Sequence, residues 1–181
     1  MQIQQLFRLL ALLTAAGSAG AHVTLEQPQA AAGSTYKAAL RVGHACEGAQ
    51  TTTAITVRLP DGFRGAKPMP KPGWTTTVKR VTLAQPYVSH GTTVTSDVVE
   101  VKWQAASAES ALSGDFYDEF VVRGQLPEAP GRLWFKVLQT CDRGAIDWAE
   151  IPASGQSSHG LQAPAASLDV VAESGHAAHA H

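Results

Sequence analysis

Between residues 22 and 152, apolar and polar residues alternate in short runs that are separated by glycine, proline and small polar residues. The segment 34–43, STYKAALRVG, places Tyr36, Leu40 and Val42 on one face, which is the period-two pattern of a half-buried strand. Comparable runs occupy residues 22–28, 51–63, 74–83, 92–104, 115–127, 131–142 and 144–152. Short strands with turn signals between them and almost no helical periodicity predict an all-β fold, an antiparallel β-sandwich.

Three segments depart from this alternation. The stretch 65–73, GAKPMPKPG, contains three prolines; because proline lacks a backbone donor, we expect a loop here and not a central strand. The segment 84–91, AQPYVSHG, is turn-like. A single helical turn is expected only within 107–115, SAESALSGD.

The first 21 residues have the features of a secretory signal peptide. Arg8 precedes an apolar run, and the segment ends in small residues, with Ala19 and Ala21 flanking the expected cleavage site. The apolar run is too short for a membrane-spanning helix. We therefore expect residues 1–21 to be removed, the mature protein to begin at His22, and its location to be periplasmic or secreted.

The rest of the chain divides into a domain and a tail. Residues 22–152 carry the strand pattern and are long enough for one hydrophobic core. In residues 153–181 apolar residues become sparse, which predicts a flexible tail. This tail contains His159, His176, His179 and His181, a candidate metal-collecting arm that would have little selectivity.

Charge and cysteine content narrow the possible functions. With 14 basic and 15 acidic residues, the formal net charge is −1, and no basic patch indicates a nucleic-acid partner. No second apolar run predicts a membrane anchor. Cys46 and Cys141 are expected to form a disulfide in an oxidising compartment, and a thiolate site for Cu(I) is the alternative.

His22 has the most distinctive chemistry if it begins the mature chain. An N-terminal histidine offers its amine and its imidazole to one ion, a nitrogen chelate that suits Cu(II). Both groups must be deprotonated to bind the ion, so the affinity for Cu(II) is expected to decrease as the pH is lowered. A carboxylate is a reasonable further ligand, and the candidates are Glu26, Glu47, Asp142 and Glu150. Glu47 is preferred because it follows Cys46, which a disulfide would hold beside the strand ending at Cys141.

Four segments carry a resemblance to a known family: AHVTLEQPQAAAGSTYKAALRVGHACEG, TTTAITVRLPDGF, PMPKPGW and VLQTCDRGAIDWAEIP. Together they are similar to the YcnI-like family of exported bacterial copper-binding proteins. The resemblance implies an immunoglobulin-like or cupredoxin-like β-sandwich that binds Cu(II) through a single-histidine brace. It assigns the brace to His22, the nearby tryptophan to Trp148 and the carboxylate to Glu47, while the acid of some members falls nearer Gln50. The membrane anchor of many members is not expected here.

Three functions are compatible with these features. We expect a copper carrier or chaperone of copper homeostasis, not an enzyme, whose partner is a copper transporter or another periplasmic copper protein. The alternative is a copper-dependent oxidative enzyme, because an N-terminal histidine also anchors copper in polysaccharide monooxygenases; that site needs a second histidine, and the internal candidates are His44 and His90. Copper-resistance carriers also recruit a second histidine. The third possibility is a metal-free interaction module, since a fold does not fix a function.

Overall fold

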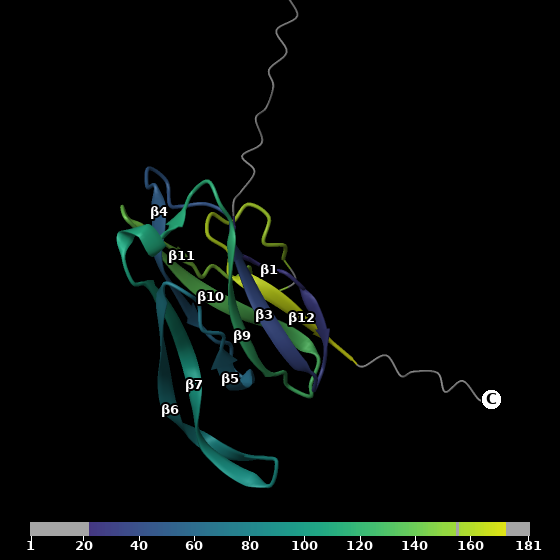
Figure 1. Ribbon diagram of the computed structural model, residues 1–181. Coiled ribbons are helices and arrows are strands. Elements are labelled where there is room, and N and C mark those ends of the chain that lie inside the picture. Colours follow the sequence, from purple (N-terminus) through teal and green to yellow (C-terminus); the bar gives the residue numbers. More distant parts are fainter. Residues whose placement is uncertain (1–21, 155, 173–181) are drawn as a thin grey trace, which may run out of the picture.

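A computed structural model describes residues 22–154 and 156–172, whose strands form two facing sheets (Figure 1). The smaller sheet has the strand order β1 (Thr24–Leu25), β3 (Thr35–Val42), β9 (Asp118–Gln125) and β5 (Arg64–Pro68). All of its pairings are antiparallel. The two-layer arrangement confirms the predicted β-sandwich.

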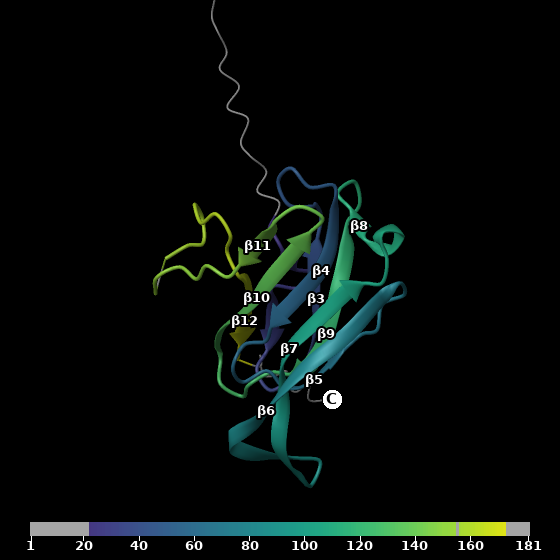
Figure 2. The same ribbon diagram turned by 90° about the vertical axis from the view of Figure 1, so that its left-hand side faces the viewer.

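The larger sheet follows the path β2 (Gln29–Ala31), β12 (Ala166–Val171), β10 (Gly131–Cys141), β4 (Thr51–Arg58), β7 (Thr92–Ala105) and β6 (Trp74–Ser89). Two short strands attach to it: β8 (Leu112–Ser113) pairs with β4, and β11 (Ala145–Trp148) pairs with β10. Figure 2 shows this sheet in front of strands of the smaller one. A single 3-10 turn, η1 (Ala108–Ser110), lies within the segment predicted to hold one helical turn.

The core lies between the sheets and is built from alternate residues of their strands. Phe120 of β9 and Trp103 of β7 are fully buried, and their rings meet edge to face with centroids 5.7 Å apart. Phe63 and Phe135 form a similar pair at 5.3 Å. Aromatic pairs in this geometry add to the stabilisation that burial alone provides. The period-two pattern therefore separates core from surface as predicted.

A long hairpin formed by β6 and β7 projects beyond the sandwich (Figure 1). The turn expected over residues 84–91 is shorter than predicted, because β6 continues to Ser89 and only His90 and Gly91 reverse the chain. These two residues have φ of 48° and 76°, as a type I′ turn requires. Pro86 is tolerated because β6 is an edge strand with an irregular register near this point.

The proline-rich segment 65–73 begins as a strand, which corrects the prediction of a loop throughout. β5 pairs with β9 at the edge of the smaller sheet. Its final residue is Pro68. An edge strand leaves one row of backbone groups unpaired, so proline at its end removes no required hydrogen bond.

The predicted flexible tail, residues 153–181, is wrong for residues 166–171. This segment is β12, which pairs with β10 and, in parallel, with β2. Leu168 is fully buried and Val170 is 4% exposed. The domain therefore extends beyond the predicted boundary at residue 152. Of the tail histidines, His159 is exposed, and His176, His179 and His181 lie outside the described residues.

The predicted signal peptide, residues 1–21, also lies outside the described residues. Within the part of the chain that the structure describes, no helix is long and apolar enough to cross a membrane.

Candidate metal centre

His22 stands immediately before the core. Val23 is 2% exposed and Leu25 is 4% exposed, and β1 pairs with β3 through Leu25 and Leu40. Burial of these two side chains fixes the start of the domain at one end of the sandwich. The half-buried imidazole of His22 meets the indole of Trp148 edge to face, with ring centroids 5.7 Å apart. Two of the three predicted site residues are therefore in contact.

Trp148 is the last residue of β11 and lies opposite Val137 of β10. It is 4% exposed. Its indole nitrogen donates a hydrogen bond of 2.9 Å to Oε1 of Gln139. Because a buried indole N–H needs an acceptor, this bond fixes the orientation of the ring that His22 contacts.

Gln139 connects this indole to a second loop. Its side chain is fully buried. Its amide nitrogen donates to the backbone carbonyl of His44 at 2.7 Å and to the hydroxyl of Thr52 at 2.8 Å. Satisfied buried amides are rigid, because each lost bond would leave an unpaired polar group in the core. Gln139 therefore holds Trp148 and the His44 loop in one arrangement.

His44 brings a second imidazole to the same indole. Its ring centroid lies 6.0 Å from that of Trp148, again edge to face. Nδ1 of His44 lies 2.6 Å from the carbonyl oxygen of Ala45. A carbonyl can only accept, so Nδ1 carries the proton and the neutral ring has its lone pair on Nε2. Nε2 is the atom with which such a histidine coordinates metals.

The other internal histidine, His90, does not join this cluster. It occupies the tip of the β6–β7 hairpin, far from β1 and β11 (Figure 1). Of the two candidates for a second histidine, only His44 is therefore close to Trp148.

The expected disulfide between Cys46 and Cys141 is present. It joins residues 95 positions apart, with Cα atoms separated by 6.0 Å. It ties the loop that follows His44 to the end of β10, and the backbone N–H of Cys46 also donates to Sγ of Cys141. Since both sulfur atoms are bonded to each other, neither is a thiolate ligand for Cu(I), the alternative that the sequence left open.

Glu26 and Glu150, two of the candidate carboxylates, have structural partners. Glu26 forms an ion pair of 2.8 Å with Arg41 of β3. Glu150 accepts hydrogen bonds from the backbone N–H groups of Gln162 and Ala163, which fastens the segment that leads into β12. Glu150 is therefore engaged in holding the fold, whereas the ion pair of Glu26 lies at the surface.

Asp142 is engaged as well. Its Oδ1 accepts the backbone N–H groups of Thr51, at 3.1 Å, and Gln50, at 2.9 Å. These hydrogen bonds, that from Thr51 first, lower the pKa of its carboxyl because they stabilise the charged form. Asp142 thus holds the start of β4 against the end of β10.

Glu47 differs from the other three candidates. It is exposed, in the turn after Cys46 that is closed by a hydrogen bond from the N–H of Ala49 to the carbonyl of Cys46. Among the described residues, no hydrogen bond or ion pair engages its carboxylate. Nothing in this arrangement tests Glu47 as a ligand, and its role remains a prediction.

The donors near Trp148 suit a soft or borderline transition metal more than calcium or magnesium. Over residues 22–154 and 156–172, no group of three or more His, Cys, Asp or Glu side chains is placed to hold a metal ion. Two imidazoles lie against Trp148, and the amine created by cleavage after Ala21 would add a third nitrogen. Nitrogen donors of this kind fit Cu(II).

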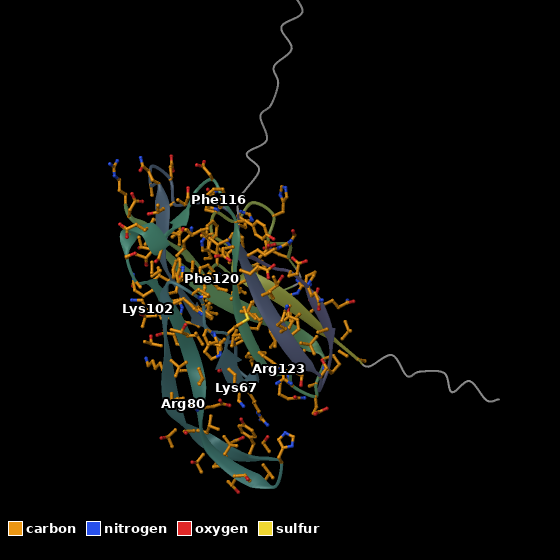
Figure 3. All side chains as sticks on the ribbon, in the orientation of Figure 1. Lys67, Arg80, Lys102, Phe116, Phe120 and Arg123 are labelled. Atoms are coloured by element: carbon orange, nitrogen blue, oxygen red, sulfur yellow. A yellow bond between two sulfur atoms is a disulfide. The ribbon has the colours of Figure 1, made fainter. Side chains whose placement is uncertain are left out.

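The surface beside His22 is open and bears aromatic side chains. A hollow of about 470 Å³ adjoins His22 and is lined by Thr24, Glu26, Arg41, Gly43, Tyr117 and Glu119. Tyr117 is 69% exposed, and Phe116, labelled in Figure 3, is 67% exposed. An ion or a partner protein can therefore approach the histidine from this side.

These features define an immunoglobulin-like β-sandwich with a histidine-tryptophan cluster at one end. A crystal structure of an uncharacterized protein from Nocardia farcinica, described as having an immunoglobulin-like fold, is 30% identical, with a TM-score of 0.62. The similarity covers 82% of this chain and 97% of that one. The chain belongs to the family described as Domain of unknown function (DUF1775), which matches residues 22–170. No curated protein matches it.

Proposed function

We propose that this protein is an exported Cu(II)-binding protein of the YcnI-like kind that carries copper and is not an enzyme. The observation that carries the proposal is the position of His22, anchored by the buried Val23 and packed against Trp148. Cleavage after Ala21 would give this histidine a free amine beside its imidazole. The two groups form a chelate that suits Cu(II).

The surroundings of His22 favour tight binding. Val23 is buried, so little backbone motion has to be lost when the chelate closes, and a preorganised site binds more tightly than a mobile one. Trp148 covers one side of the imidazole with an apolar ring whose own nitrogen is occupied by Gln139. An apolar shell of this kind limits the access of water to a bound ion.

A carrier must release its ion to a partner, and the surface next to His22 is suited to this exchange. The hollow beside it is shallow and the exposed Phe116 and Tyr117 border the same end of the sandwich. Exposed aromatic residues are enriched in protein interfaces. We propose that a copper transporter or another periplasmic copper protein docks here.

A copper-dependent oxidative enzyme is the second candidate, and His44 is the observation that favours it. Such a site requires a second imidazole, and the ring of His44 contacts the same indole, that of Trp148, as the ring of His22. Consumption of oxygen by the copper-loaded protein in the presence of ascorbate, above the rate of an equal concentration of free copper, would support it. A rate no higher than free copper would favour the carrier.

Titration with Cu(II) tests the proposal. The chain from His22 to His181 is compared with the same chain carrying one additional alanine before His22, and His176, His179 and His181 are replaced by alanine in both. We expect one tightly bound equivalent in the first protein and collapse of this binding in the second. Equal binding by the two proteins, or binding by neither, would show that His22 is not the anchor.

A further inference from the structure

We infer that His44 supplies a second imidazole to the copper centre, so that its principal donors are three nitrogen atoms and not two nitrogens with the Glu47 carboxylate. This inference rests on the proposed binding of Cu(II) at His22. The three donors would be the mature amine, the imidazole of His22 and Nε2 of His44.

The first argument is placement. The imidazoles of His22 and His44 both meet the indole of Trp148 edge to face, at centroid distances of 5.7 and 6.0 Å. The two histidines come from separate parts of the chain, one before β1 and the other in the loop between β3 and β4. A single buried tryptophan therefore collects both rings at one end of the sandwich.

The second argument is rigidity. The carbonyl of His44 accepts a 2.7 Å hydrogen bond from the buried amide of Gln139. Two residues later, the Cys46–Cys141 disulfide fastens the same loop to β10. A ligand on a loop held at both points needs little reorganisation to bind. Gln139 is then a positioning residue, because it orients Trp148 and holds the His44 backbone at the same time.

The third argument is the state of the His44 ring. Its Nδ1 donates to the carbonyl of Ala45, which leaves the lone pair of the neutral ring on Nε2. Metal-ligating histidines characteristically donate their other ring N–H to a carbonyl or carboxylate, which fixes the tautomer and the orientation of the ring. His44 therefore has the hydrogen bond expected of a metal ligand.

Glu47 lacks these features. It lies in the same loop, but its side chain is exposed and its carboxylate has no hydrogen-bond or ion-pair partner among the described residues. An exposed carboxylate on a turn would have to be ordered before it could bind, at a cost in side-chain entropy. The better-prepared donor of this loop is His44.

Matched substitutions in one loop test the inference. The protein that begins at His22, with the three histidines beyond residue 172 replaced by alanine, is compared with its H44Q, H44F and E47Q variants. Affinity is measured by competition with a Cu(II) chelator, and the number of coupled nitrogen nuclei is counted by electron paramagnetic resonance and electron-nuclear double resonance.

We expect both His44 variants to lose more than about 100-fold in affinity, which exceeds the usual effect of removing a partner that only orients a ligand. The coupled nitrogens should fall from three to two. E47Q should keep three nitrogens and lose less than about 10-fold, which is below that range. Three nitrogens in the His44 variants, or a larger loss in E47Q, would overturn the inference.

Two further measurements separate binding from packing. The first is thermal unfolding of the copper-free variants, which shows whether each is folded. Because H44F keeps an aromatic ring at this position, a folded H44F whose copper centre has one coupled nitrogen fewer supports ligation by His44. Free imidazole added to H44G should restore the third nitrogen signal, which a packing role would not produce. If the parent protein binds no Cu(II), the proposed function fails. If it binds Cu(II) through only two nitrogens, the proposed function stands and only the assignment of His44 as a ligand is excluded.

Discussion

The indole nitrogen of Trp148 donates to the side-chain oxygen of Gln139, and this one bond joins the ring beneath His22 to a fully buried amide of β10. The same amide donates to the carbonyl of His44 and to Thr52. The residues of the candidate metal centre are therefore held in place by a buried hydrogen-bond network and not only by surface loops.

Replacing Gln139 with leucine should destabilise the protein by about 2–4 kcal/mol, because the Trp148 N–H and the His44 carbonyl lose their buried partner. Urea unfolding at neutral pH measures this change. The control is Gln104→Leu, since the half-buried Gln104 amide makes one bond, to the carbonyl of Thr53. Equal losses in the two variants would contradict the structural role assigned to Gln139.

Trp148→Phe should abolish most of the quenching of tryptophan fluorescence that Cu(II) causes, because Trp148 is the indole in contact with His22. The variant should also bind copper more weakly, since the phenyl ring cannot bond to Gln139. Trp134→Phe is the control, because Trp134 lies on β10 next to β12, beside Arg132. Quenching that survives in W148F but not in W134F would place the ion elsewhere.

The double variant C46S/C141S should lose about 4–5 kcal/mol of stability if the cross-link acts mainly on the unfolded chain. It should also bind Cu(II) less tightly, since the disulfide holds the loop that bears His44. Urea unfolding and copper competition measure the two effects on the same samples. Oxidised wild-type protein and wild-type protein treated with a reductant are the reference states, and the reduced wild type should match the variant.

Leu168→Ala tests the assignment of β12 to the core, and should cost about 2–5 kcal/mol, as is typical of a buried leucine. Ser167→Ala, on the neighbouring position of the same strand, should change stability by less than about 0.5 kcal/mol. Thermal or urea unfolding distinguishes them. If L168A left the stability unchanged, residues 166–171 would not belong to the core, as the sequence prediction of a flexible tail had it.

Asp142 should contribute to stability in a pH-dependent manner. Its pKa is lowered in the folded state by hydrogen bonds from Thr51 and then Gln50, so the contribution is complete above the ordinary value of 3.8 and disappears as the pH falls through the lower folded value. Asp142→Asn should therefore have a lower Tm than the wild type at pH 6, and the difference should shrink below about pH 3.8. A constant difference from pH 6 to pH 2 would exclude this linkage.

The sandwich could be predicted because most of its strands carry a period-two pattern of buried and exposed residues, although β3 and β9 also contain consecutive buried residues. Tyr36, Leu40 and Val42 point into the core from β3, as their spacing indicates. β12 could not be predicted in the same way, because alanine and serine dilute the apolar positions around Leu168 and Val170. Its burial depends on pairing with β10 and β2, which the local sequence does not reveal.

The candidate site was predictable in part. The expected cleavage after Ala21 indicated His22, the resemblance to a family assigned Trp148, and the structure places the two residues in contact. Gln139 was missed because a polar residue in a strand is normally taken to face solvent, although it occupies the same inward face as Val137 and Cys141. The closeness of His44 to Trp148 depends on how a loop folds over the end of β10, and no periodicity reports this.

The pairing of β12 with β2 has a consequence for how the protein assembles. Gln29 lies opposite Asp169, so a strand near the start of the domain is joined to one near its end. β12 also separates β2 from β10 in the larger sheet. A chain emerging from the ribosome therefore cannot complete this sheet until almost the whole domain has been synthesised. Contacts between such distant segments slow folding, and the nascent polypeptide should stay open for most of its synthesis.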